Sequence, residues 1–177
     1  MRVRDHLALT TAGAAVLGPL LHRGAFGLWA GGALLDVDHY VWFCARHRSW
    51  DPVGAVRYFN GADVPQEPAT RLLHSRAALV VMLLLGARHK RALPIAVGMG
   101  AHVALDAYHE LHMSAAREEA LRRDEFACQA CGTRAPDVGT HLWQQPWLLP
   151  SYEPQNLVSL CAACHALAHA NGSGSWN

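Results

Sequence analysis

The sequence predicts two parts, an α-helical bundle over residues 1–113 and a small α+β module held by zinc over residues 114–170. The first part is rich in Ala, Leu, Gly and Val, whereas four of the five cysteines lie in the second part. A chain of 177 residues is long enough for one ordinary domain or two small ones. The formal net charge of +1 gives no global basic field that would indicate nucleic acid. Residues 171–177 form a Gly/Ser-containing tail that we expect to be flexible.

Four apolar runs predict helices in the first part. They are Leu7–Leu21, Ala25–Leu35, Ala77–Ala87 and Ala92–Leu105. Each run is shorter than the roughly 20 residues that a membrane-spanning helix needs. The runs fit either the core helices of a compact bundle or short, tilted membrane helices, and we slightly favour membrane association. The polar stretch over residues 49–70 predicts a loop or lid.

The polar residues of this apolar part are acids and histidines, which are costly inside apolar helices unless they are paired or bind a metal. His102, Asp106 and His109 have the i, i+4, i+7 spacing of one helical face. Bundles build metal sites from such side chains on several helices. The alternative is that they are helix-end carboxylates and ordinary core histidines. The candidates are His6, Asp36, Asp38, His39, His74, His102 and Asp106.

The second part contains two CxxC pairs, Cys128/Cys131 and Cys161/Cys164, about thirty residues apart. Two such pairs complete the tetrahedral set of sulfur ligands that structural Zn²⁺ takes. A redox pair or disulfides are the weaker alternative, because one CxxC suffices for redox chemistry. Free thiolates imply a reducing compartment, so we expect the chain in the cytoplasm. Bound zinc would contribute about 10–16 kcal/mol to folding of this small module.

Further residues of the module carry a resemblance to the HNH, or ββα-metal, endonucleases. The matching features are the CxxCG opening at Cys128, the position of His141, the run NLVSLC from Asn156, and the segment CHALAH that ends at His169. His165 and His169 are four residues apart, and therefore share one helical face.

The resemblance implies an endonuclease that hydrolyses phosphodiester bonds of DNA or another nucleic acid. It makes His141 the general base, with Asn156 holding its imidazole or shaping the connecting loop. His165 and His169 would hold a catalytic cation, which could be Mg²⁺, Mn²⁺, Ni²⁺ or Zn²⁺. The local arginines near the first knuckle could contact phosphates; these are Arg122, Arg123 and Arg134. Thr140 departs from the family, which usually has a His or Asp ligand before the base, so we expect weaker metal binding.

The first part resembles the bacterial membrane-bound metal-dependent hydrolases, through the segments LLDVDHY, LLHSR and GAHVALDAYH. This resemblance implies that the seven candidates above bind one or two divalent metals, with zinc expected, and that the chain associates with the inner membrane. It gives a second hypothesis, a hydrolase of phosphoester or lipid substrates with an accessory zinc module. A third hypothesis is a nucleic-acid-binding module without catalysis.

Overall fold

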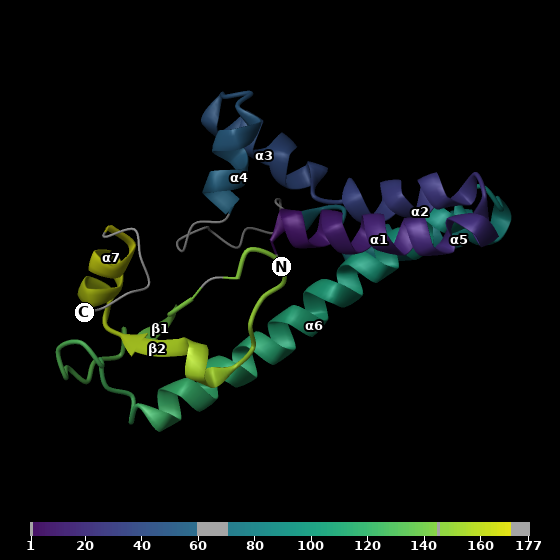
Figure 1. Cartoon of the computed structure of the whole chain (residues 1–177). Helices are drawn as coiled ribbons and strands as arrows, with labels where there is room; N and C mark the ends of the chain where they lie inside the picture. The colour runs from purple at the N-terminus through teal and green to yellow at the C-terminus, as the bar shows by residue number, and fades with distance from the viewer. Residues whose placement is uncertain (1, 60–70, 145, 171–177) are drawn as a thin grey trace. The chain divides into compact units, whose positions relative to one another are not determined.

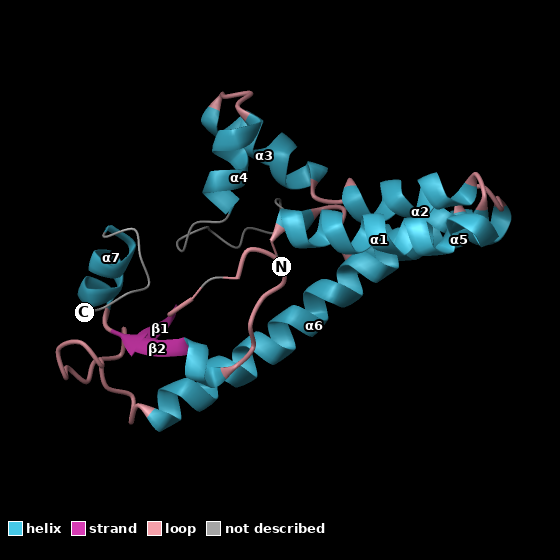
Figure 2. Cartoon of the chain, in the orientation of Figure 1, coloured by secondary structure: helices cyan, strands magenta, loops and turns pink. Residues whose placement is uncertain are grey.

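The computed structural model describes residues 2–59, 71–144 and 146–170. The chain divides into two compact units, Met1–Asp106 and Ala107–Asn177, so the boundary lies earlier than the expected residue 113. The expected flexible tail at 171–177 lies outside the described residues, as does the second half of the expected loop, residues 60–70. The described residues are mostly helical with one small two-stranded sheet, which agrees with the coarse fold class expected from the sequence (Figure 2).

The first unit is built of helices alone among its described residues (Figure 1). All four apolar runs form helices, apart from Leu34, Leu35 and Ala92 at the ends of their runs. The helices are α1 (Val3–Leu21), α2 (Gly24–Ala33), α3 (Val37–His47), α4 (Pro52–Phe59), α5 (Arg76–Arg88) and the first part of α6 (Leu93–Arg123). Helix α4 corrects the prediction of a loop over residues 49–70. Its aromatic residues Tyr58 and Phe59 pack against rings of α3, and this tertiary packing outweighs the local Pro and Gly signals.

Glycines let α2 and α6 touch along their backbones. A methyl group on Gly98 would collide with the carbonyl oxygen of Leu28, and one on Gly31 would collide with the carbonyl oxygen of Ile95. Helix α5 starts at a conventional cap, since the hydroxyl of Ser75 accepts a hydrogen bond from the Ala78 N–H at 3.1 Å. The close approach of α2 and α6 fixes the start of α6, which carries His102 and Asp106.

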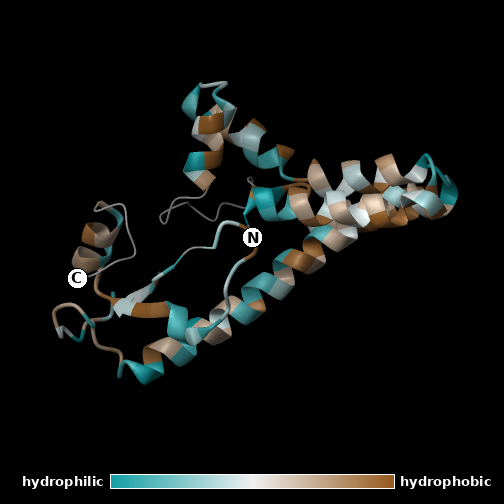
Figure 3. Cartoon of the chain, viewed as in Figure 1, coloured by the Kyte–Doolittle hydropathy of each residue, from teal (hydrophilic) through white to brown (hydrophobic). Residues whose placement is uncertain are grey.

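Burial in the first unit is unusual, because polar side chains occupy its most enclosed positions. Asp5, His6 and His102 are all at most 2% exposed. Large apolar residues lie on the outside of α1 and α5, and Figure 3 shows these helices mainly in pale to brown colours, with hydrophilic turns. None of the described helices is long and apolar enough to span a membrane.

The second unit contains the rest of α6, strands β1 (Gly139–Leu142) and β2 (Leu157–Leu160), the short 3₁₀ helix η2 (Pro154–Asn156) and helix α7 (Ala162–Ala170). The strands pair antiparallel, with Thr140 opposite Ser159 and His141 opposite Val158. This β–β–α order sets α7 directly after β2. One small core surrounds Cys128 and Leu160.

A second small core lies against the C-terminal part of α6. Ala116 and Ala120 of α6 are buried against Leu157 and Leu142. These residues belong to one continuous helix of 31 residues. The alternation of small apolar residues with charged ones on this helix produces one buried face and one solvated face.

Candidate metal centres

The four cysteines of the second unit lie close enough together to hold a metal such as zinc. Their sulfur atoms are all within 4.8 Å of one another. The Cys131 and Cys161 sulfurs are 3.8 Å apart, which equals the edge of about 3.8 Å expected for a tetrahedron with Zn–S bonds of about 2.3 Å. This confirms the expectation that the four cysteines form a cluster that could hold a metal.

The first knuckle depends on a glycine after its second cysteine. Gly132 has a φ of +75°, which other residues rarely adopt, and its N–H donates to the Cys128 carbonyl at 2.8 Å. Burial acts to raise the pKa of the Cys128 thiol, but backbone N–H groups around its sulfur lower that pKa to about 6. A thiolate is the form that binds a metal.

Three histidines gather beside the cysteine cluster. His141 comes from β1, whereas His165 and His169 lie one turn apart on α7; their ligand atoms are all within 4.8 Å. The Nε2 atoms of His165 and His169 are 3.2 Å apart, close to the edge of about 3.3 Å for two imidazoles bound to one tetrahedral zinc. The His141 ring lies 5.1 Å from the His165 ring and 4.9 Å from the His169 ring, between ring centres. The structure thus brings these three predicted residues together.

Burial and the nearby charges of His165 and His169 lower the pKa of His141. The ring is therefore neutral near pH 7 and has a nitrogen able to accept a proton.

The side chain of Asn156 hydrogen-bonds the loop after β1 and not His141. Its Oδ1 accepts from the Gln144 N–H at 2.8 Å, and its Nδ2 donates to the Gln144 carbonyl at 2.7 Å. Of the two roles expected for Asn156, these contacts favour shaping of the loop.

The three arginines differ in what they contact. Arg123 donates to both carboxylate oxygens of Asp124 and to the carbonyls of Pro154 and Leu157. These four hydrogen bonds engage its guanidinium inside the unit, so we do not retain it as a phosphate contact. Arg122 and Arg134 form exposed pairs with Glu118 and Glu125, and exposed pairs exchange readily for other partners.

A separate centre lies in the first unit, where four of the seven candidate side chains converge. His74 Nε2 and His102 Nε2 are 3.1 Å apart. Asp36 Oδ1 lies 3.3 Å from the first nitrogen and 3.4 Å from the second. Asp106 Oδ2 lies 3.9 and 3.6 Å from the same two atoms. The separations among Asp36, His74 and His102 are near the edges of about 3.3 Å of a tetrahedral zinc site with nitrogen and oxygen ligands, and those to Asp106 are longer.

The histidines of this centre are oriented by their other ring nitrogens. His102 Nδ1 lies 2.7 Å from the Gly32 carbonyl oxygen, which can only accept, so Nδ1 carries a hydrogen and Nε2 is the nitrogen that could bind a metal. His74 Nδ1 is 3.2 Å from Asp38 Oδ2, and that carboxylate also accepts from the Leu73 N–H at 2.9 Å. Metal-binding histidines characteristically have such partners. The residues present therefore fit a divalent metal.

The other three candidates lie around these four. His6 Nε2 contacts Asp106 Oδ1 at 2.9 Å, and its ring stacks on His102 with 3.7 Å between ring centres. Asp38 supports His74, and His39 lies parallel to the His74 ring at 4.9 Å. Two further groups, His6/His102/Asp106 and Asp38/His39/His74, also bring ligand atoms within 4.8 Å, so the centre could take one or two ions. His109 does not join it, because its Nδ1 contacts the Tyr152 hydroxyl in the second unit at 3.1 Å.

Charges in this centre are strongly coupled. Burial acts to raise the pKa of Asp36, but hydrogen bonds with His102 and His74 lower it well below its usual value. The pKa of Asp106 is also lowered. Burial acts to raise this pKa, whereas the hydrogen bond with His6 acts to lower it. Burial would lower the pKa of His74, yet Asp36 and Asp38 raise it to about 9. Without a metal, bound protons thus balance the negative charge of the carboxylates. A divalent cation would balance the same charge.

Two contributors have no sequence signal. The Gly32 carbonyl and the Leu73 N–H are backbone groups, and any residue type supplies them. No family model, no curated protein and no solved structure matches the chain.

Proposed function

We propose that the second unit is an HNH-type metal-dependent endonuclease that hydrolyses phosphodiester bonds of DNA or another nucleic acid. The observation that carries the proposal is the approach of His141 to the His165/His169 pair, with 3.2 Å between the Nε2 atoms of that pair. The β–β–α order and the adjacent cysteine cluster support it, since they place a strand residue opposite two residues on the following helix.

In this proposal His141 takes the proton of the attacking water as general base. A divalent cation held by His165 and His169 would polarise the phosphoryl oxygen and stabilise the leaving oxygen. Asn156 fixes the loop that follows the base-bearing strand. Arg122 and Arg134 contact phosphates of the strand, exchanging their carboxylate partners for them. Thr140 contributes only a hydroxyl next to the base, so a cation there would have two imidazole ligands and would be held weakly.

Nicking of supercoiled plasmid tests the proposal. Purified full-length protein is incubated with plasmid and Mg²⁺, Mn²⁺, Ni²⁺ or Zn²⁺ in turn. We expect nicking with at least one ion and a loss of about 10²- to 10⁴-fold in His141→Ala, because removal of a general base costs that much. His169→Ala should lower the rate and shift half-maximal activity to higher metal concentration.

The matched control is Glu110→Gln, which changes an exposed residue of the same unit outside the cluster. It should nick like the wild type. Nicking that survives His141→Ala would show that His141 is not the base. Plasmid binding without nicking under any metal would leave the non-catalytic nucleic-acid-binding hypothesis in place of the nuclease.

A second function is favoured by the four converging ligand atoms of Asp36, His74, His102 and Asp106. We infer that the first unit is itself a metal-dependent hydrolase of phosphoester or lipid substrates. Turnover of bis(p-nitrophenyl) phosphate tests this. The test is made in His141→Ala, which lacks the proposed general base of the second unit: turnover that remains in this variant should be abolished by adding His102→Ala or Asp106→Ala. Equal turnover in His141→Ala with and without His102→Ala would exclude catalysis at this centre.

A further inference from the structure

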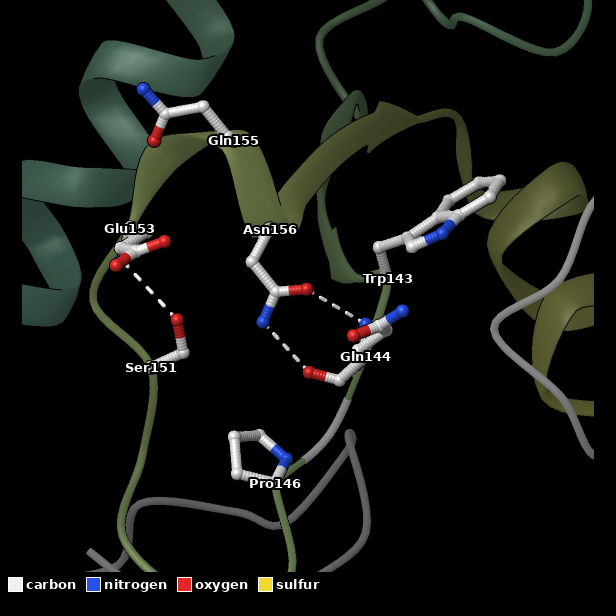
Figure 4. Close-up of a pocket in the computed structure, with 7 residues that line it drawn as sticks. All are labelled: Trp143, Gln144, Pro146, Ser151, Glu153, Gln155 and Asn156. Carbon is white, nitrogen blue, oxygen red and sulfur yellow. Dashed lines mark hydrogen bonds between the residues drawn. The ribbon is translucent and has the colours of Figure 1, made fainter.

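A cavity of about 560 Å³ lies in the second unit, in the segment that connects β1 to β2. Its volume is within the range of about 300–1,000 Å³ that is typical of small-molecule sites. Figure 4 shows Asn156 and Gln144 facing Ser151 and Glu153 across the cavity, with Pro146 at one edge. The lining is completed by Trp143 and Gln155. Trp143 follows His141 by two residues, or about 7 Å of extended chain.

Both walls of this cavity are braced. The wall formed by Trp143 and Gln144 is held by the two hydrogen bonds between Asn156 and the Gln144 backbone, at 2.8 and 2.7 Å. The wall formed by residues 151–153 is held by Tyr152, whose hydroxyl contacts His109 of α6 at 3.1 Å and whose ring packs against Tyr108 and His112. The cavity is therefore formed before any ligand arrives, which lowers the entropic cost of binding.

The chemistry of the lining selects against phosphate. None of the seven lining residues is a cation, and Glu153 contributes a carboxylate. Among the described residues, the side chains of Glu153, Gln144 and Gln155 have no hydrogen-bond partner, so their polar groups remain for a ligand. Trp143 and Pro146 add apolar surface. A flat, uncharged ligand with several N–H groups fits this combination, and an unpaired nucleobase is such a ligand.

We propose that this cavity binds one unpaired nucleobase of the nucleic-acid strand that the proposed nuclease would cleave, with guanine as the preferred base. Guanine presents two parallel N–H donors, N1–H and the 2-amino group, which match the two oxygens of the Glu153 carboxylate. The glutamine amides can donate to its carbonyl oxygen and ring nitrogens. The proposal rests on the proposed endonuclease function and adds to it a preference for guanine next to the cleaved phosphate.

Titration of the zinc-loaded full chain with nucleosides tests the cavity without any cleavage. Guanosine, adenosine, cytidine, uridine and inorganic phosphate are added separately, and binding is measured by calorimetry. We expect guanosine to bind most tightly and phosphate not to compete with it. Glu153→Gln should weaken guanosine at least fivefold, since a good bidentate pair contributes about 1–3 kcal/mol of discrimination. Gln144→Ala, which spares the backbone contacts of that residue, should weaken it too.

Glu110→Gln is the matched control, because Glu110 is also exposed in the second unit but does not line the cavity. It should bind guanosine like the wild type. Equal affinity for all four nucleosides, no binding of any of them, or unchanged guanosine affinity in Glu153→Gln would each overturn the proposal.

Mapping of the cleavage products separates this proposal from the nuclease itself. If both hold, nicks occur next to guanine, and Glu153→Gln removes that preference while His141→Ala removes nicking. Nicking that depends on His141 but ignores Glu153→Gln would refute the base pocket alone. Guanosine binding that depends on Glu153, in a protein that nicks equally with and without His141, would refute the nuclease mechanism alone.

Discussion

Asp124 holds the end of α6 against β2 through one buried carboxylate. Its oxygens accept from Arg123 Nε at 2.7 Å, from Arg123 Nη2 at 2.8 Å and from the Ser159 N–H at 3.0 Å. Burial acts to raise the pKa of Asp124, but these hydrogen bonds lower it below the ordinary value. The ionised carboxylate is thus favoured in the folded protein.

We predict that Asp124→Asn lowers the free energy of unfolding of the second unit by about 1.5–3 kcal/mol at pH 7, the range for hydrogen bonds to charged groups. Because the folded pKa lies below the unfolded one, the wild-type advantage is fully present above the unfolded pKa of about 3.9. It disappears as the pH falls through the folded pKa. Denaturant unfolding of both proteins from pH 8 to pH 3 measures this difference.

The control for Asp124→Asn is Glu118→Gln, which breaks the exposed pair with Arg122. Exposed pairs contribute about 0–1 kcal/mol, so this variant should stay close to the wild type at all pH values. An Asp124→Asn deficit that persists unchanged at pH 3 would contradict the assigned role of the carboxylate charge.

At the residue scale, the sequence predicted which side chains gather as candidate metal ligands. It did not predict which groups other polar side chains contact. The CxxC spacing, the i, i+4 histidines of CHALAH and the His102/Asp106 spacing all identified residues that the fold brings together. Arg123 shows the limit, because its guanidinium contacts carbonyls 31 and 34 residues away. His109 shares the spacing of the metal face but contacts Tyr152. Both partners come from tertiary contacts that local spacing does not encode.

The contact between helices α2 and α6 is the element-level feature on which the first metal centre depends. It brings Gly32 to His102, one helical turn beyond Gly98. We predict that Gly98→Ala destabilises the first unit by about 1–3 kcal/mol through overpacking, because the added methyl meets the Leu28 carbonyl. Thermal unfolding followed by circular dichroism measures the change.

Gly100→Ala is the matched control on the same helix. Its added methyl would meet only Leu79 Cδ1 at 3.9 Å, and alanine favours helix over glycine by up to about 1 kcal/mol. Gly100→Ala should therefore be neutral or stabilising. Equal effects of the two substitutions would contradict the close approach of α2 and α6.

At the element scale, apolar runs of ten residues or more predicted their helices well, because periodicity over several turns is a strong signal. Helix α4 was missed, since it is only 8 residues long and begins at Pro52 after a polar stretch. Its stability comes from aromatic contacts with α3, such as Tyr58 against Phe43 with ring centres 5.7 Å apart. Short helices that depend on tertiary contacts carry little local signal.

For the whole molecule, the distribution of apolar surface predicts a membrane interaction. Val16, Leu20 and Phe26 of the first unit are 75%, 78% and 71% exposed, and Arg88 at the end of α5 is followed by Lys90 and Arg91 in the next turn. Exposed apolar side chains next to basic ones suit an anionic lipid surface. We predict that the full chain floats with phosphatidylglycerol vesicles in a density gradient and that Leu20→Ser with Phe26→Ser reduces the bound fraction.

The control for vesicle flotation is Leu111→Ser, which changes a residue 67% exposed on α6 in the second unit. This variant should float like the wild type. Protein that stays at the bottom of the gradient with both anionic and neutral vesicles would contradict membrane association.

The number of tightly bound ions tests how the two units use metals. The cysteine cluster and the Asp36/His74/His102/Asp106 centre each offer four ligand atoms, whereas His165 and His169 offer two from the surface of α7. A site with four protein ligands keeps its ion through desalting, and a two-ligand site loses it. We predict at least two zinc ions per desalted chain by elemental analysis, with the population at the first-unit centre lost in Asp36→Asn with His102→Ala.

His89→Ala is the control for this count, since it removes an exposed histidine of the first unit that is outside every ligand group, and it should keep the wild-type number of ions. The second-unit cysteines are unchanged in the double variant, so one zinc must remain with them. The wild type could instead contain one zinc ion per chain, with the same number in the double variant. That result would mean that the buried acids and histidines neutralise one another with protons alone. The raised pKa of His74 would then reflect a structural ion-pair network, and hydrolysis at the first-unit centre would be excluded.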